Sequence, residues 1–225
     1  MPRQRFWTLR SKRTIVAAGA LERTIAFGNN DRPGIMNVNA GRAYLNRYGV
    51  LAGQKIVVAT NNDSAYSSAA EFANAGASVS LLDARGSVGS DVTDIAGNAN
   101  IDVQFGAAPL NALGGPGIYA LELATAKGDS WAKGSSKRAD LVLLSGGWSP
   151  LVNLMSHRGV RPVWNAEQAC FIAPHTDEPI HVAGSAAGIW NTADCVASGE
   201  AAAADAINAM GGSASAAMPE VGGWA

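Results

Sequence analysis

The segment from residue 55 to residue 83 constrains the fold of this chain more than any other. Residues 55–60, KIVVAT, form a continuous apolar run, as expected of a strand in a parallel sheet covered on both faces. A polar turn follows, then residues 65–75 predict a helix that stops at Gly76, and residues 78–82 predict a second strand that ends at Asp83. Strand, turn, helix and strand within about 30 residues form a βαβ unit. The sequence therefore predicts an α/β protein with a three-layer, Rossmann-like parallel sheet.

Other elements are predicted from shorter patterns. Residues 14–20 read as a short strand entering a glycine turn, and residues 39–48 as a helix that stops at Gly49. Residues 118–124 fit a strand or a helix equally well. The remaining predictions are strands at 101–105, 139–145 and 180–184, a hairpin or surface loop at 127–137, and an alanine-rich helix from about 186 to 210.

Composition and motif spacing exclude several classes of protein. Hydrophobic residues are 48% of the chain and charged residues 16%, which argues against intrinsic disorder. The net charge of −1 gives no indication of nucleic-acid binding, which normally requires an excess of positive charge. No apolar stretch is long enough to span a bilayer. The basic N-terminal residues are interpreted as a polar loop before a strand, not as an export signal, so the expected compartment is the cytoplasm.

Cysteine and histidine spacing predicts no metal site. Cys170 and Cys195 form no CxxC pair, and His157, His175 and His181 show no HExxH spacing. No Ser/His/Asp or Cys/His arrangement is indicated either. We therefore assign no catalytic residue and no metal ligand from the sequence.

The turn after the first strand of the βαβ unit is a candidate dinucleotide site. The three glycine positions of a GxGxxG fingerprint fall on Thr60, Asn62 and Ala65, of which only the alanine is a tolerated replacement. Asn62 could contact a phosphate or simply form an Asx-type turn. Asp83 stands where a carboxylate would accept hydrogen bonds from a ribose 2′-hydroxyl, or it is only a solvated strand end. The candidate cofactor-binding residues here are Thr60, Asn61, Asn62, Asp63, Ala65 and Asp83.

Two further glycine turns follow predicted strands. Gly146 and Gly147 precede Trp148, which could stack on a cofactor ring or belong to the core or to an interface. Gly184 and Ser185 join a strand to the final helix, where free backbone N–H groups could face a phosphate or a flavin. The alternative for the second turn is tight packing of the helix on the strand.

Several segments together resemble the α subunit of heterotetrameric sarcosine oxidase. Residues 15–23, IVAAGALER, resemble the ATGA-ERP segment of flavoproteins with two dinucleotide-binding domains, which adds Ala18 and Gly19 to the candidate cofactor-binding residues. The remaining segments are residues 30–36, 44–49, 60–66, 140–150 and 184–188. The resemblance covers the chain to about residue 210.

The resemblance implies a subunit of an oxidoreductase that acts on CH–NH donors. Members of this family demethylate sarcosine to glycine, form hydrogen peroxide and pass the one-carbon unit to tetrahydrofolate. The α subunit binds NAD, the β subunit carries FAD, and FMN lies between them, so FMN and FAD are expected only in the assembled complex. The expected partners are the other subunits, the flavin-bearing β subunit above all.

The resemblance also predicts how the chain is organised. Residues 1–48 are expected to be the end part of a first dinucleotide-binding domain, residues 49–139 an inserted NAD-binding domain, and residues 140–225 the return to the first domain with a C-terminal helix. On this interpretation the chain is an internal slice, without the GxGxxG unit before it and the folate domain after it. A non-catalytic scaffold subunit, or a fragment without independent activity, is the alternative.

Overall fold

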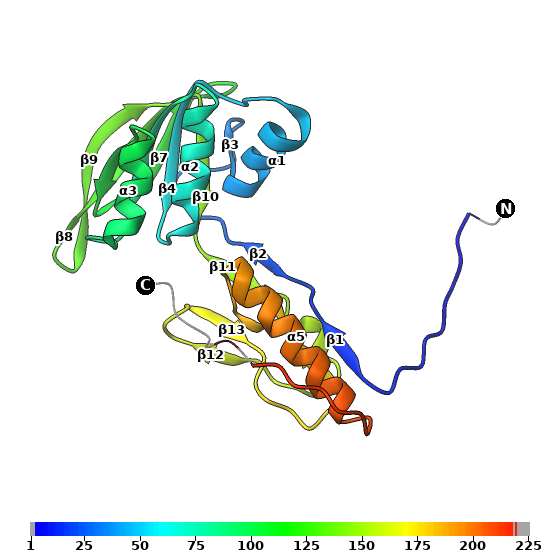
Figure 1. The fold of residues 1–225 in the computed structure, drawn as a ribbon. Helices are drawn as coiled ribbons and strands as arrows, with labels where there is room; N and C mark the ends of the chain where they lie inside the picture. Colours follow the sequence, from blue (N-terminus) through cyan, green and yellow to red (C-terminus); the bar gives the residue numbers. More distant parts are fainter. Residues whose placement is uncertain (1–2, 218, 220–225) are drawn as a thin grey trace. The chain divides into compact units, whose positions relative to one another are not determined.

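The computed structural model describes residues 3–217 and residue 219 (Figure 1). The described chain forms two compact units. We call residues 22–148 the continuous unit, and residues 3–21 together with 149–217 the split unit. A short two-stranded sheet pairs β2 (Ala20–Glu22) with β11 (Trp148–Pro150).

A five-stranded parallel sheet is the centre of the continuous unit. In spatial order its strands are β3 (Ile35–Asn37), β10 (Leu141–Ser145), β4 (Lys55–Thr60), β5 (Ser78–Asp83) and β6 (Asp102–Phe105). Three helices accompany it, namely α1 (Val38–Tyr48), α2 (Ser64–Asn74) and α3 (Ser90–Asn98). A three-stranded antiparallel sheet completes the unit, in the order β7 (Ala107–Gly114), β8 (Ile118–Lys127) and β9 (Ser130–Arg138).

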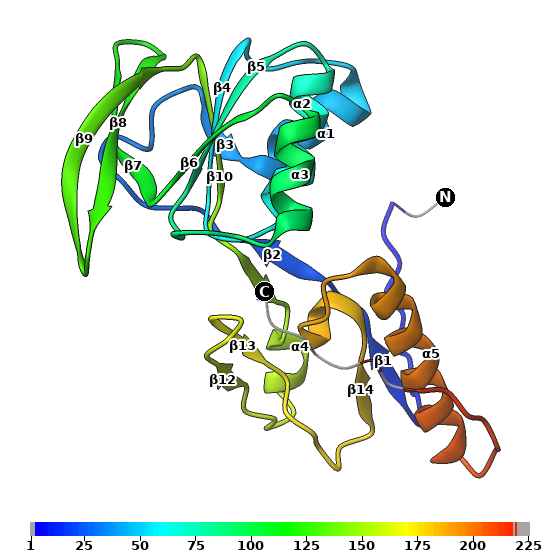
Figure 2. The same ribbon diagram turned by 60° about the vertical axis from the view of Figure 1, so that its left-hand side comes forward.

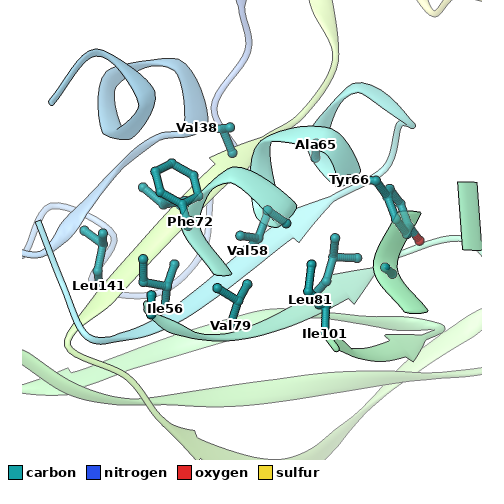
Figure 3. Close-up of a cluster of buried hydrophobic side chains, with 14 of the residues drawn as sticks. Val38, Ile56, Val58, Ala65, Tyr66, Phe72, Val79, Leu81, Ile101 and Leu141 are labelled. Atoms are coloured by element: carbon teal, nitrogen blue, oxygen red, sulfur yellow. The ribbon is translucent and has the colours of Figure 1, made fainter. Parts of the chain in front are cut away.

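The parallel sheet is covered on both faces, as its apolar strands predict. Figure 2 shows the three helices on one face and strands β7–β9 on the other. Ile56 and Val58 of β4 belong to the core beneath the helices, with Tyr66 and Phe72 (Figure 3). The alternate residues Val57 and Ala59 belong to a second core against the antiparallel sheet. Both sets of side chains in β4 are buried, which explains why residues 56–59 carry no polar side chain.

Most predicted elements of this unit are confirmed, and two are settled by pairing. Residues 118–124, open between strand and helix, lie in β8, which pairs with β7 and β9. Residues 127–137 form a hairpin, since β8 and β9 are joined by a turn at residues 128–129. Helix α3 was not predicted.

The split unit is built from short elements. Strand β1 (Thr14–Val16) pairs in parallel with β14 (Ile180–Val182), and β12 (Val163–Asn165) pairs in antiparallel with β13 (Cys170–Ile172). Helix α5 (Thr192–Asn208) packs beside β1 and β14, and α4 (Asn153–Ser156) is a single turn. The Asn191 side chain caps α5 by accepting hydrogen bonds from the amides of Ala193 and Asp194.

Two predictions in the split unit need correction at their ends. The strand predicted at 14–20 is shorter than expected, because β1 ends at Val16; the predicted glycine turn lies at Gly19, which adopts φ +80 before β2. The long helix predicted from about residue 186 begins instead as a 3₁₀ turn, Gly184–Ala187, and Gly188 at φ +78 separates this turn from α5.

The compact units do not follow the predicted boundaries at residues 48/49 and 139/140. Strands β3 and β10 and helix α1 lie outside residues 49–139, yet both strands are hydrogen-bonded within the same parallel sheet. The inserted segment therefore does not complete its sheet alone. At the other end, residues 218 and 220–225 of the predicted third segment lie outside the described residues.

The described part of the chain offers no membrane span and no metal centre. None of its helices has the length and apolar character needed to cross a bilayer. Within residues 3–217 and residue 219, no three His, Cys, Asp or Glu side chains are grouped so that they could hold a metal ion.

Candidate functional site

The strongest candidate site lies at the carboxyl edge of the parallel sheet. Thr60, Asp83 and Ser145 are the last residues of β4, β5 and β10, and all three are buried. Strands β5 and β6 extend the sheet on one side of β4, whereas β10 and β3 extend it on the other. A change of direction of this kind is a topological switch point, where ligands of open α/β sheets bind.

Asn62 ties together the two loops that meet at this switch point. Its side chain is 2% exposed, and Nδ2 donates to the backbone oxygen of Ser145 at 3.0 Å and to Ser145 Oγ at 3.3 Å. The Asn62 amide donates to Thr60 Oγ1 at 3.1 Å, and that hydroxyl donates to the Asn62 carbonyl at 3.0 Å. The carboxamide therefore builds the turn, and its amide group is already engaged instead of reaching toward a phosphate.

The first turn of α2 faces this loop with its positive dipole end. Asp63 occupies the N-cap position but makes no side-chain capping hydrogen bond there. Ser64 Oγ donates to Asn62 Oδ1 at 2.6 Å and accepts from Trp148 Nε1 at 3.0 Å. Ala65, at the third fingerprint position, is buried in the helix-side core. Main-chain N–H groups left uncapped at a helix start are suited to an anion.

Asp83 is neither a solvated strand end nor an open acceptor. Its side chain is fully buried, and Oδ2 accepts from Tyr66 Oη at 2.8 Å and from Arg85 Nη2 at 2.9 Å. Oδ1 accepts from the Arg85 amide at 2.9 Å and from Arg85 Nε at 3.1 Å. Asp83 is therefore neither a free acceptor for a ribose hydroxyl nor a solvated strand end, as the sequence had suggested. Tyr66 and Arg85 already occupy the hydrogen-bonding positions of its carboxylate.

Arg85 and Tyr66 are the residues that sequence reasoning missed at this edge. Arg85 Nη2 also lies 2.7 Å from Asp63 Oδ1, so one guanidinium bridges two carboxylates. Burial, followed by the hydrogen bond to Asp83, raises the pKa of Tyr66 and keeps it a donor. The sequence feature that could have indicated Arg85 is its position two residues after the aspartate at the end of a strand. Dinucleotide-binding folds bind the ribose close to this point.

Gly146 and Gly147 serve packing at the end of β10. The Gly146 amide donates to the Arg23 carbonyl at 2.8 Å, and the Arg23 amide donates to the Gly147 carbonyl at 2.8 Å. A Cβ on Gly146 would lie 2.9 Å from the Thr24 carbonyl oxygen, and Gly147 adopts φ +90. These glycines allow the segment at residues 23–24 to approach the strand end closely.

The other predicted residues form a second cluster, in the split unit. Ala18 and Gly19 follow β1, and Gly184 and Ser185 follow β14, so the parallel pairing brings both ends together. A Cβ on Gly19 would lie 4.0 Å from Ser185 Oγ. The Gly184 amide donates to Ser198 Oγ of α5 at 2.7 Å, which is the helix–strand packing given as the alternative for this turn.

A cavity of about 700 Å³ also lies in the split unit and was not predicted. Its wall is mixed in charge. Among its lining residues are Arg13, His175, His181, Asp177, Glu178 and Asp205.

Comparison with known proteins extends the resemblance found in the motifs. No protein-family model matches the chain. It is 36% identical over 212 residues to the sarcosine oxidase subunit alpha of Rhizobium meliloti (strain 1021), and 37% identical over 212 residues to that of Corynebacterium sp. (strain P-1). These alignments cover 94% and 93% of this chain but 20% and 22% of the relatives. The chain thus spans about a fifth of their length.

Solved structures share the fold at low sequence identity. L-Proline dehydrogenase from P. horikoshii matches with a TM-score of 0.62 at 18% identity, over 91% of this chain and 36% of its own. A ferredoxin reductase from Rhodopseudomonas palustris matches with a TM-score of 0.65 at 16% identity, over 92% of this chain and 54% of its own. The chain therefore shares the mixed α/β, Rossmann-like fold of these proteins, and its sequence is similar over nearly its whole length to part of the sarcosine oxidase α subunit.

Proposed function

We propose that this chain is the nucleotide-handling part of an oxidoreductase subunit of the sarcosine oxidase α type, with NAD held at the carboxyl edge of the parallel sheet in the continuous unit. One observation carries the proposal. The first turn of α2, which has no side-chain cap, begins at the switch point where β4 lies between β10 and β5. The sequence similarity to sarcosine oxidase α subunits supports the same assignment.

The residues at this edge fit a dinucleotide only in part. The N–H groups at the start of α2 would face the pyrophosphate, and bound NAD would supply a hydride-carrying nicotinamide. Thr60 and Asn62 stand where glycines normally let the backbone approach, and both side chains are buried in the turn. We therefore expect weak binding by the isolated chain.

The activity of the whole enzyme is part of this proposal. The relatives are named as sarcosine oxidase subunits, and oxidative demethylation of a CH–NH donor is the corresponding reaction. This chain would contribute nucleotide binding, with a flavin-bearing β subunit as partner and with FMN and FAD present only in the assembled complex. We assign no catalytic residue to it.

A carboxylate placed beside the start of α2 tests the site. Asn61→Asp keeps an oxygen that can accept the hydrogen bond from Asn62 Nδ2, now at 3.2 Å, and adds a negative charge at an exposed position. We expect calorimetric titration of the full chain to give about tenfold weaker NAD binding at low ionic strength, with a smaller loss as salt rises.

The matched control lies at the other end of the same helix. Asn74→Asp makes the same change at the exposed last residue of α2, away from the proposed pyrophosphate position. It should leave the NAD affinity unchanged. Equal losses in the two variants would contradict the site, and so would an unaltered affinity in Asn61→Asp.

A scaffold role is the second candidate function, and one observation favours it. Among the described residues β1 and β14 pair only with each other, and Ile15 in β1 is 43% exposed. Strand edges of this kind add strands from another segment or subunit. On this candidate, amide exchange in β1 and β14 would slow when a partner subunit is co-expressed, without any effect of NAD.

A further inference from the structure

The group that a ligand would meet at the end of β5 is not Asp83. Asp83 is fully buried, whereas the side chains of Arg85 and Asp63 are 25% and 23% exposed. These two residues form the solvent-facing part of the cluster, and Asp83 lies beneath them with Tyr66 as its other partner. A nucleotide ribose approaching this edge would therefore contact Arg85 and Asp63 before it could reach Asp83.

The cluster combines two features that dinucleotide folds normally use separately. A carboxylate at this strand end accepts from the 2′-hydroxyl of NAD, whereas an arginine nearby accommodates the 2′-phosphate of NADP. Here Arg85 donates to Asp83 through Nε and Nη2, and Nη2 also pairs with Asp63. The charges of Arg85 and Asp83 neutralise each other. Asp63 adds a second carboxylate, so the three side chains Arg85, Asp83 and Asp63 together carry one net negative charge.

The positive charge of Arg85 is stabilised by the two carboxylates beside it. Burial alone lowers the pKa of Arg85, but the hydrogen bonds to Asp83 and the ion pair with Asp63 outweigh it and raise the pKa above its usual value. Arg85 therefore carries its positive charge at neutral pH. Its guanidinium is also fixed in direction, because the Asp83 carboxylate holds one edge of the fork.

We propose, on the basis of the NAD site proposed above, that the Arg85–Asp63 pair reads the adenosine ribose and that the Asp63 carboxylate is the specificity determinant that excludes a 2′-phosphate. Asp83 and Tyr66 are positioning residues that hold Arg85. With Asp63 present, the guanidinium is already balanced and a 2′-phosphate meets net negative charge. Without the Asp63 charge, the Arg85–Asp83 pair is neutral, and a 2′-phosphate at this edge no longer meets a second carboxylate beside the guanidinium.

The test is Asp63→Asn in the full chain, titrated with NAD and with NADP. Asparagine retains an oxygen that can accept from Arg85, so the buried Arg85–Asp83 pair keeps its surroundings. We expect the affinity for NADP relative to NAD to rise about tenfold, with the NAD affinity changed by less than about threefold. The melting temperature, measured in parallel, should stay within about 2 °C of the parent chain, because this is a partly exposed position.

Asp102→Asn is the control for a general effect of charge. Asp102 is 71% exposed and pairs with Lys137 at the beginning of β6, the opposite edge of the sheet. Its NADP-to-NAD ratio should equal that of the parent chain. The same rise in both variants, or an unchanged ratio in Asp63→Asn while NAD still binds, would overturn this inference alone. Failure of the parent chain to bind either nucleotide would overturn the proposed function together with it.

Discussion

The two units of this chain bury their apolar residues in different ways. In the continuous unit, both faces of one sheet are covered, and large side chains such as Phe72, Leu121 and Leu143 are fully buried. In the split unit most of the buried apolar residues are alanines, notably in α5, while Trp164 and Phe171 pair edge to face at 56% and 54% exposure. Apolar content alone therefore does not reveal which region closes a core.

This difference has an energetic consequence. A buried leucine or phenylalanine contributes about 1.5–3 kcal/mol by leaving water, and an alanine contributes far less because it has little side-chain surface. A two-stranded parallel pair such as β1 and β14 also has few neighbours to share its hydrogen bonds. We therefore assign most of the stability of the chain to the continuous unit.

Truncating one apolar side chain in each unit should give the largest contrast. Leu143 is fully buried, and its Cδ2 lies 2.9 Å from where a Cβ on Gly41 would stand. We expect Leu143→Ala to lower the free energy of unfolding by about 3 kcal/mol. Ile15→Ala, at a 43% exposed position in β1, should cost about 1 kcal/mol or less. Urea unfolding followed by circular dichroism measures both, and equal losses would abolish the distinction between the units.

A smaller effect is expected from an ion pair that links two helices of the continuous unit. Arg42 of α1 donates to Glu71 of α2 through Nε at 2.9 Å and Nη2 at 2.6 Å, and Asn46 Nδ2 donates to Glu71 at 3.0 Å. The hydrogen bond from Arg42 lowers the pKa of Glu71, although burial opposes it. Glu71→Gln should therefore destabilise by about 0.5 kcal/mol at pH 7, since the pair is partly exposed.

The pH dependence of this pair has a definite sign. Because the folded-state pKa of Glu71 is below its ordinary value of 4.5, its contribution is present above that value and is lost as the pH falls through the folded-state pKa. Parent and Glu71→Gln should therefore converge in acid. Glu178→Gln is the matched variant in the split unit, where Arg158 and Glu178 are 51% and 36% exposed. A larger effect there than at Glu71 would reverse the comparison.

The fold was predictable wherever the sequence encodes it locally. The apolar runs at 55–60 and 78–82 predicted β4 and β5, and Gly49 and Gly76 marked the ends of α1 and α2. Residues 118–124 remained ambiguous because their conformation is decided by pairing with β7 and β9. Helix α3 was missed because only Val92 and Ala96 of its nine residues are buried, which leaves a weak periodic pattern.

The position of the candidate site could be predicted from the sequence, but the hydrogen-bond partners of its residues could not. Asp83 was expected at the end of β5, where it lies. Its engagement by Tyr66 and Arg85 depends on how α2 packs on the sheet and on the turn after β5, neither of which spacing reveals. The same holds for Asn62, whose partner Ser145 is 83 residues away in sequence.

Amide hydrogen exchange along the full chain, with and without NAD, tests the account most directly. The slowest exchange should be in β4, β5 and β10, and exchange in β1 and β14 should be faster. Adding NAD should slow exchange further at residues 60–66 and 83–86 and leave residues 180–188 unchanged. Uniformly slow exchange in both units of a monodisperse monomer, or an NAD effect confined to the split unit, would contradict it.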